Sequence, residues 1–162
     1  YLASSQKEDE GKLRLYEDRL LPLAKLYSLD ACMEKALSRQ VWLKSGGYLV
    51  IEPTEALTVI DVNTGKYSGR KNASETIRAI NLEAAEEIGR QMALRNLSGI
   101  ILVDFIDMET AQDREFLMER LRQICRQDPV KTTVVDMTAL NLVEITRKKL
   151  KKPLHEMVRG QR

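Results

Sequence analysis

Apolar residues occur in short runs and in longer periodic segments, and the two patterns predict different elements. Short apolar runs bounded by glycine, proline or polar residues are typical of β-strands. They predict strands at residues 42–43, 48–51, 57–62, 100–103 and 131–137. Gly46-Gly47 marks a turn between the first two strands, so the chain is expected to form a β-meander there.

Segments in which apolar residues recur every three or four positions predict amphipathic helices. They lie at residues 29–39, 72–96, 110–128 and 138–150. Asn72 with Glu75, and Thr110 with Asp113, are capping signals at the starts of two of these helices. Pro129 is expected to end the third helix.

The order of these elements predicts an α/β (α+β) domain. Three strands come first, and alternating helices and strands follow. Helices that cross over between apolar strands are typical of layered folds, here with a mixed sheet. A short strand or turn around Pro22 is expected before the first helix. The 162 residues suffice for one such domain with its own hydrophobic core.

Composition narrows the functional classes. The net charge is +2, so a surface that binds nucleic acid would have to be local. Cys32 and Cys125 are far apart and form no zinc-binding motif, which suits a reducing compartment. No apolar run reaches the roughly 20 residues of a membrane helix. The N-terminus has neither a signal-like apolar segment nor an initiator Met, so we expect a fragment of a longer protein.

Three aspartates stand at the ends of predicted strands, in "TVIDVN", "LVDF" and "TVVD". They are Asp61, Asp104 and Asp136. An ionised carboxylate in apolar surroundings is unfavourable unless it is paired or binds a cation. An aspartate at a strand end also commonly caps the next turn. Periodicity alone does not distinguish among the three.

Asp61 and Asp104 are candidates for a shared metal site. If their strands are neighbours, the two carboxylates converge at the carboxyl edge of the sheet, where ligand sites cluster in such folds. Oxygen ligands favour Mg²⁺ or Mn²⁺ over zinc, and Mg²⁺ bound by carboxylates suits phosphodiester chemistry. Asn63 shares the strand face of Asp61 and is placed to orient a phosphate oxygen or a bound water. Asp107 is a candidate for a supporting role.

The loop that follows Asp61, "TGKYSGRKN", is basic. Lys66, Arg70 and Lys71 lie near Tyr67, with two glycines. Basic residues and an aromatic beside a metal site suit a nucleic-acid backbone, and a solvated loop without a ligand is the alternative. The run "RKKLKKP", from residue 147 to residue 153, is also open to two interpretations. It is either a phosphate-binding patch or a helix end stabilised by its dipole.

Several blocks of the sequence together resemble the ribonuclease E/G family. These are "GGYLVIEPTEALTVIDVNTG", "NLEAAEEIGRQMALRNLSGIILVDFIDM" and "ITRKKL", in this order, and the resemblance covers about residues 16–150. It implies a deoxyribonuclease-I-like catalytic subdomain in which two aspartates, matching Asp61 and Asp104, hold a catalytic Mg²⁺. The family's active-site asparagine matches Asn63. On this resemblance Asp136 is not one of the pair.

The resemblance also implies an activity. Members of the family are endoribonucleases that cut single-stranded, often A/U-rich RNA in rRNA and tRNA maturation and in mRNA decay. Their products carry 5′-phosphate and 3′-hydroxyl ends. The resemblance therefore predicts RNA as the partner, Mg²⁺ or alternatively Mn²⁺ as the cofactor, and a cytoplasmic location in a bacterium or plastid.

Domain boundaries are predicted from the same resemblance. Residues 1–36 resemble the end of a ribonuclease-H-like subdomain, residues 37–158 the catalytic subdomain, and residues 159–162 a C-terminal tail. The family's OB-fold RNA-binding domain, its pocket for a 5′ monophosphate and its zinc-binding cysteine motif are expected to lie outside this sequence. A zinc-linked homo-oligomer is accordingly expected only of a longer protein. A non-catalytic RNA-binding or assembly module is the alternative function of the isolated chain.

Overall fold

The computed structural model describes residues 11–65 and 73–159, and the chain divides into two compact units after Glu34. The first unit contains the short helix α2 (Leu23–Leu26) and the start of α3 (Leu29–Leu37). Before α2, Asp18 accepts hydrogen bonds from the backbone N–H groups of Leu20 and Leu21, which closes a turn. The expected strand or turn is therefore a turn. The assignment of residues 1–36 to a separate subdomain stays a prediction.

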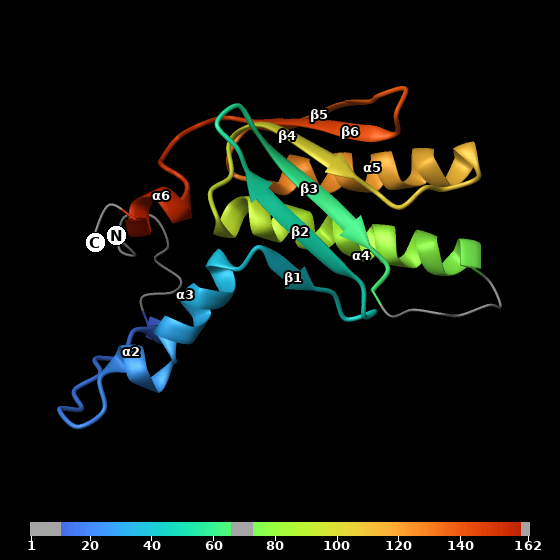
Figure 1. Ribbon diagram of the computed structural model, residues 1–162. Coiled ribbons are helices and arrows are strands. Elements are labelled where there is room, and N and C mark those ends of the chain that lie inside the picture. The colour runs from blue at the N-terminus through green and yellow to red at the C-terminus, as the bar shows by residue number, and fades with distance from the viewer. Residues whose placement is uncertain (1–10, 66–72, 160–162) are drawn as a thin grey trace. The chain divides into compact units, whose positions relative to one another are not determined.

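The second unit contains a six-stranded mixed sheet in the order β1-β2-β3-β4-β6-β5 (Figure 1). Its strands are β1 (Gln40–Trp42), β2 (Tyr48–Pro53), β3 (Leu57–Asn63), β4 (Gly99–Asp104), β5 (Thr132–Met137) and β6 (Leu142–Arg147). β3 and β4 run parallel, and the other neighbouring strands are antiparallel. The long helix α4 (Ala73–Leu94) connects the two parallel strands. The α/β class with a mixed sheet and a crossover helix is confirmed.

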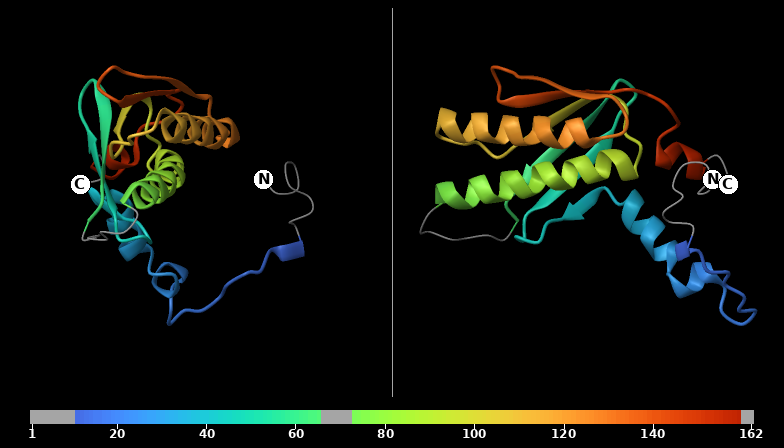
Figure 2. Two further views of the ribbon diagram at one scale, coloured as in Figure 1. Left: turned by 90° about the vertical axis from the view of Figure 1, so that its right-hand side faces the viewer. Right: turned by 180° about the vertical axis from the view of Figure 1, so that it is seen from behind.

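Two helices, α4 and α5 (Ala111–Gln127), cover one face of the sheet (Figure 2). Every second residue of the central strands points to these helices, and Ile60, Val103 and Ile145 have no exposed surface. On α4, Ile80 and Ile88 meet them in the same core. The described residues of this unit leave the opposite face open, and we call it the open face. Side chains at alternate strand positions therefore separate into a packed set and an open set.

The start and end of α5 follow the sequence signals. The hydroxyl of Thr110 accepts a hydrogen bond from the backbone N–H of Asp113 at 3.0 Å, and the helix ends at Gln127, two residues before Pro129. The capping signal at Asn72 lies outside the described residues. Among the helices that the structure describes, none has the length and apolar character needed to cross a membrane.

The predicted helix at residues 138–150 is wrong. The structure has the strand β6 there, followed by the short helix α6 (Leu154–Arg159). Val143, Ile145 and Arg147 are buried at alternate positions, which is the two-residue period of a strand. β6 pairs with β4 along its whole length, so burial against the core overrides the weak helical spacing of the segment.

Candidate active site

Asp61 and Asp104 lie side by side on the open face of the sheet. Their Cα atoms are partners in the parallel pairing of β3 with β4, so the two residues stand one strand apart, about 4.8 Å. Asp61 is half-buried and Asp104 is exposed. The preceding residues, Ile60 and Val103, point into the core and fix the register of both strands. The structure thus brings these two predicted site residues together.

Asn63 holds the carboxylate of Asp61. It lies two residues further along β3, on the same face, and its side-chain Nδ2 donates a hydrogen bond to Oδ2 of Asp61 at 2.7 Å. This bond compensates part of the cost of placing a charged carboxylate in a half-buried position. It also fixes the orientation of the carboxylate beside Asp104.

Negative charge accumulates around Asp104. Partial burial is the main cause that raises the pKa of this carboxyl above its ordinary value, and the charges of Asp61 and Asp107 raise it further. Carboxylates this close repel one another unless a cation lies between them. The donor set is oxygen only, which suits a hard divalent cation such as Mg²⁺ or Mn²⁺.

The number of protein ligands also bears on the choice of metal. Within residues 11–65 and 73–159, no group of three or more His, Cys, Asp or Glu side chains is arranged to hold a metal ion. A carboxylate pair fits Mg²⁺, which is usually held by one or two carboxylates together with waters and substrate phosphates. The pair of Asp61 and Asp104 has the oxygen ligands that suit such an ion.

Asn81 fixes the chain that follows Asp104, and it was missed by the sequence analysis. This residue is completely buried on α4. Its Nδ2 donates to the backbone O of Ile106 at 2.7 Å, and its Oδ1 accepts from the backbone N–H of Ile106 at 3.1 Å. Asn81 thereby clamps the segment between Asp104 and Asp107. The available signal was an amide on the apolar face of a helix, because such a group needs a buried partner.

Asp107 is held from the other side of the same loop. Asn141 donates from Nδ2 to Oδ1 of Asp107 at 3.2 Å, and Asn141 itself adopts a left-handed backbone conformation with φ 62°. The turn between β5 and β6 therefore contacts the segment that follows β4. Asp107 lies close enough to Asp104 to affect its pKa, as a supporting carboxylate would.

Glu83 anchors the β1–β2 turn beside the end of β3, and it was also missed by the sequence analysis. Its two carboxylate oxygens accept hydrogen bonds from the backbone N–H groups of Lys44 and Ser45 at 2.6 and 3.1 Å. Burial would raise the pKa of Glu83, but hydrogen bonds from Ser45 and Lys44 outweigh it and lower the pKa. A Cβ added to Gly47 would lie 2.8 Å from the backbone O of Asn63, so the turn packs directly on the site.

Asp136 is not brought to this site. It lies on β5, which is separated from β4 by β6, and it is exposed. Its Oδ1 accepts a hydrogen bond from the backbone N–H of Met137 at 2.8 Å, as in a local cap of the chain. Asp136 is therefore a strand-end aspartate that lies apart from the Asp61–Asp104 pair.

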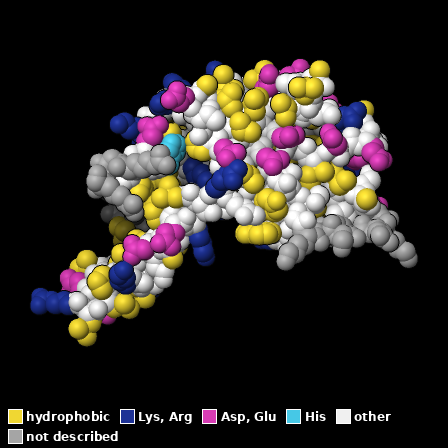
Figure 3. All heavy atoms as spheres, in the orientation of Figure 1, with side chains coloured by type: hydrophobic (Ala, Val, Ile, Leu, Met, Phe, Trp, Pro, Cys, Tyr) yellow, Lys and Arg dark blue, Asp and Glu magenta, His cyan; other side chains and the backbone are white. Residues whose placement is uncertain are grey.

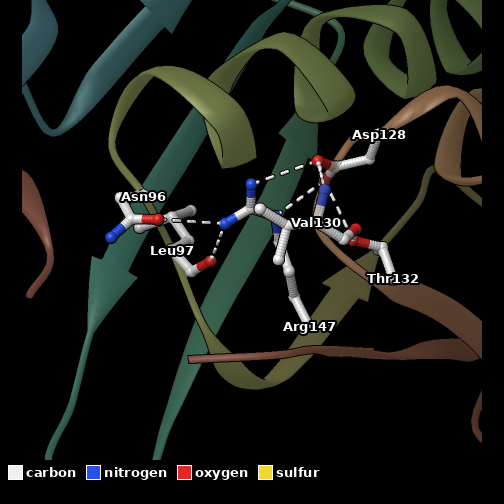
Figure 4. A network of polar contacts seen from close by, with 6 residues as sticks. All are labelled: Asn96, Leu97, Asp128, Val130, Thr132 and Arg147. Carbon is white, nitrogen blue, oxygen red and sulfur yellow. Dashed lines mark hydrogen bonds and ion pairs between the residues drawn. The ribbon is translucent and has the colours of Figure 1, made fainter. Parts of the chain in front are cut away.

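The basic run at residues 147–152 contains one residue that is structural. The side chain of Arg147 is only 3% exposed, and its Nε lies 2.7 Å from Oδ2 of Asp128 (Figure 4). Its Nη1 donates to the side chain of Asn96 and to the backbone O of Leu97. Arg147, at the end of β6, therefore ties the α4–β4 connection to the α5–β5 connection and is not available to an RNA phosphate. The lysines of the run are exposed.

The predicted RNA-binding residues Lys66, Arg70 and Lys71, together with Tyr67, lie outside the described residues. The last residue described before this loop is Gly65, which lies two residues after the end of β3 and has φ +64°. A Cβ at Gly65 would collide with the backbone O of Gly46, so only glycine fits between β3 and the β1–β2 turn. The basic loop thus begins next to Asn63.

Comparison with known proteins finds a family that matches this sequence. The sequence profile of the Ribonuclease E/G family matches residues 1–150. Ribonuclease G of Escherichia coli K12 is 43% identical over 151 residues, which cover 93% of this chain and 31% of that protein. Ribonuclease G of Haemophilus influenzae is 44% identical with 93% and 30% coverage, and ribonuclease E of Nostoc is 44% identical with 84% and 20% coverage. The chain spans less than a third of the length of these relatives.

Proposed function

Because this chain belongs to the ribonuclease E/G family, we propose that it carries the catalytic carboxylates of an endoribonuclease that cuts single-stranded, A/U-rich RNA. Asp61 and Asp104 hold one Mg²⁺, and Mn²⁺ can replace it. The observation that supports this proposal is the position of the two aspartates as direct partners on the open face. Their mutual repulsion favours a bound cation, and a hard cation suits their oxygen ligands.

The chemistry proposed for this site is hydrolysis of a phosphodiester. When bound, the cation supplies Lewis-acid polarisation of a phosphoryl oxygen. Asp61 and Asp104 position it, and Asn63 keeps the Asp61 carboxylate oriented through its 2.7 Å hydrogen bond. Attack of water on phosphorus, with the 3′ oxygen as the leaving group, yields the 5′-phosphate and 3′-hydroxyl ends that we expect.

The site is also open to a long, flexible substrate. Figure 3 looks onto the open face and shows acidic side chains among hydrophobic ones over the strands, with Lys or Arg side chains beside some of them. We propose that Lys66, Arg70 and Lys71, in the loop that follows Asp61 and Asn63 in the sequence, contribute phosphate contacts, because basic side chains neutralise the charge of an RNA backbone. RNA as the partner, processing of rRNA and tRNA, mRNA decay and a cytoplasmic location belong to the same proposal.

Single-turnover cleavage of a fluorescent A/U-rich oligonucleotide, with the protein in excess, tests this function. We expect cleavage that requires Mg²⁺ and that Asp61→Asn and Asp104→Asn each reduce by at least about 100-fold, as for other losses of transition-state charge stabilisation. Asp136→Asn is the matched control, because it removes an exposed strand-end carboxylate outside the pair, and it should cleave normally.

Three results would contradict the catalytic proposal. Cleavage that persists without a divalent cation would remove the metal from the reaction. RNA binding without cleavage under any metal condition would instead favour the alternative, a non-catalytic RNA-binding or assembly module. Equal loss in the Asp136→Asn variant would indicate that the effect of the substitutions is not specific to the pair.

A further inference from the structure

An exposed tryptophan lies close to the candidate active site. Trp42, at the end of β1, has 62% of its surface exposed although it is the largest apolar side chain of the protein. It is also the sole Trp in the sequence. A buried core role is excluded by this exposure, and exposed aromatic rings often mark binding surfaces. The position of Trp42 in the sheet shows on which face of the sheet this exposed ring lies.

The strand register places Trp42 in one row with Asn63. Trp42 is the Cα partner of Tyr48 in the β1–β2 pair, and Tyr48 is the partner of Asn63 in the β2–β3 pair. Directly opposed residues on antiparallel strands share a face, so all three side chains lie on the open face. Neighbouring strands are about 4.8 Å apart, which puts Trp42 about 10 Å from Asn63 along the row.

The two aromatic rings support each other. Their centroids are 5.3 Å apart with an interplanar angle of 57°, a tilted arrangement of the kind that aromatic pairs prefer. Tyr48 is half-buried between Trp42 and Asn63. The pair therefore limits the motion of the exposed indole at low cost in side-chain entropy, as a stacking surface requires.

We infer that Trp42, supported by Tyr48, stacks on one base of single-stranded RNA whose backbone crosses the Asp61–Asp104 pair. This inference rests on the proposed function and names a positioning residue for it. Unstacked bases of single-stranded RNA pack on aromatic rings in many binding proteins, and the contact tolerates any base because each has a π-face. The row that contains Asn63 and the aromatic pair leads away from the carboxylates, so the stacked base belongs to a nucleotide near, but not at, the cleaved bond.

The fluorescence of the protein reports this contact directly, because Trp42 is its sole Trp. The probe is a short single-stranded A/U oligonucleotide with 2′-O-methyl riboses and phosphorothioate linkages, titrated in the presence of a chelator. Stacking should quench the indole fluorescence on binding. A series of oligonucleotides with one abasic position each should lose the quenching at one position and keep it at the others. Quenching that is absent, or that persists with a fully abasic strand, would overturn the inference.

Substitutions give an independent measurement through the anisotropy of a labelled oligonucleotide. Trp42→Ala should weaken RNA binding by about 5- to 150-fold, the range expected for one stacked base. Trp42→Phe should recover most of the affinity because it keeps an aromatic face. Phe116→Ala is the matched control, since Phe116 is also an exposed aromatic but lies on α5, which covers the other face of the sheet. Equal affinity of Trp42→Ala and the wild-type protein would contradict the stacking role.

The failure of this inference is distinguishable from failure of the proposed function. If Trp42 stacks on RNA but the carboxylates are not catalytic, the quenching survives while Mg²⁺-dependent cleavage is absent. In the opposite case the carboxylates are catalytic but Trp42 contacts another part of a longer protein. Cleavage then depends on Asp61 and Asp104, while Trp42→Ala changes neither the RNA affinity measured by anisotropy nor the position of cleavage. The second outcome overturns the inference alone.

Discussion

At the scale of single residues, Asp104 lies beside two other carboxylates that affect its charge. Its pKa is raised by partial burial and by Asp61 and Asp107, so the folded state binds the proton of this carboxyl more tightly than the unfolded state does. The stability contributed by such a group is present when it is protonated at low pH, and it is lost as pH rises through the raised pKa. At neutral pH the ionised Asp104 therefore destabilises the metal-free fold.

Asp104→Asn should consequently make the metal-free protein slightly more stable, by less than about 1 kcal/mol because solvent screens this exposed side chain. Mg²⁺ should stabilise the wild-type protein, by about 2.7 kcal/mol at 100 times its dissociation constant, and should not stabilise the variant. Urea unfolding in EDTA and in Mg²⁺ measures both effects. Lower stability of Asp104→Asn in EDTA would show that the carboxylate is structural.

Asp128 and Arg147 form a buried ion pair at the edge of the core. Burial would raise the pKa of Asp128, but hydrogen bonds from Arg147, Val130 and Thr132 and the charge of Arg147 lower it. Asp128→Asn should cost about 3–5 kcal/mol of unfolding free energy because Arg147 is left buried without its counter-charge. Glu52→Gln, which removes the exposed partner of Arg39, is the control and should cost less than about 1 kcal/mol.

The same pair predicts a pH dependence. A lowered pKa means that Asp128 stabilises the fold above its unfolded pKa, near 3.8, and that this stability is lost as pH falls through the lowered folded pKa. The difference between the wild-type protein and Asp128→Asn should therefore shrink below about pH 4. Urea unfolding at pH 7 and pH 3 checks the direction, and a difference that grows in acid would contradict it.

At the scale of elements, α4 contributes more to the site than its role as a crossover helix suggests. Its residues Asn81 and Glu83 hold the segment after β4 and the turn between β1 and β2. Asp61 and Asp104 occupy strand positions set by packing, but the loops beside them depend on these polar contacts. We therefore expect substitutions on the face of α4 that meets the sheet to alter metal binding at the site.

Asn81→Ala tests this role. It leaves both backbone groups of Ile106 without their buried partner, which should cost about 1–3 kcal/mol. Hydrogen exchange of the Ile106 amide should become faster, and the affinity for Mn²⁺ should fall while the protein stays folded. Glu86→Ala, on the exposed face of the same helix, is the control. Loss of stability with unchanged amide exchange at Ile106 would place the effect of the substitution elsewhere.

Elements were predictable from sequence where local pattern and tertiary burial agree. The capping signal at Thr110 and the apolar run that became β4 are local, and both are present as expected. Residues 142–147 also carry apolar residues at helical spacing, and only pairing with β4 makes them a strand. Asn81 and Glu83 act across more than 20 positions of sequence, so their partners are defined only by the fold.

Local sequence pattern was also insufficient to identify the candidate pair of aspartates. Three strand-end aspartates were equivalent in the pattern, and the family resemblance selected Asp61 and Asp104. The strand order gives the physical reason, since β3 and β4 are neighbours while β5 lies beyond β6. Charge on the loop after β3 was visible in sequence, whereas the position of Trp42 in one row with Tyr48 and Asn63 required the register of three strands.

At the scale of the whole molecule, the chain represents 31% or less of the relatives compared above. Catalysis at a phosphodiester depends on holding the phosphate in line with the attacking water, and a displacement of 1 Å can cost about 100-fold in rate. We therefore expect kcat/KM of this chain to be about 100-fold or more below that of a full-length ribonuclease G on the same oligonucleotide. Equal values would show that this chain positions the scissile bond without further domains.

The central claim is that Asp61 and Asp104 share one divalent cation, and direct titration with Mn²⁺ tests it most closely. Calorimetry together with the electron paramagnetic resonance signal of free Mn²⁺ gives the number of bound ions per chain. We predict that the wild-type protein binds one Mn²⁺ ion, which Mg²⁺ displaces. This site should be lost in Asp61→Asn and in Asp104→Asn, and it should be unchanged in Asp136→Asn. A site that survives in either variant of the pair, or that disappears in Asp136→Asn, would contradict the account.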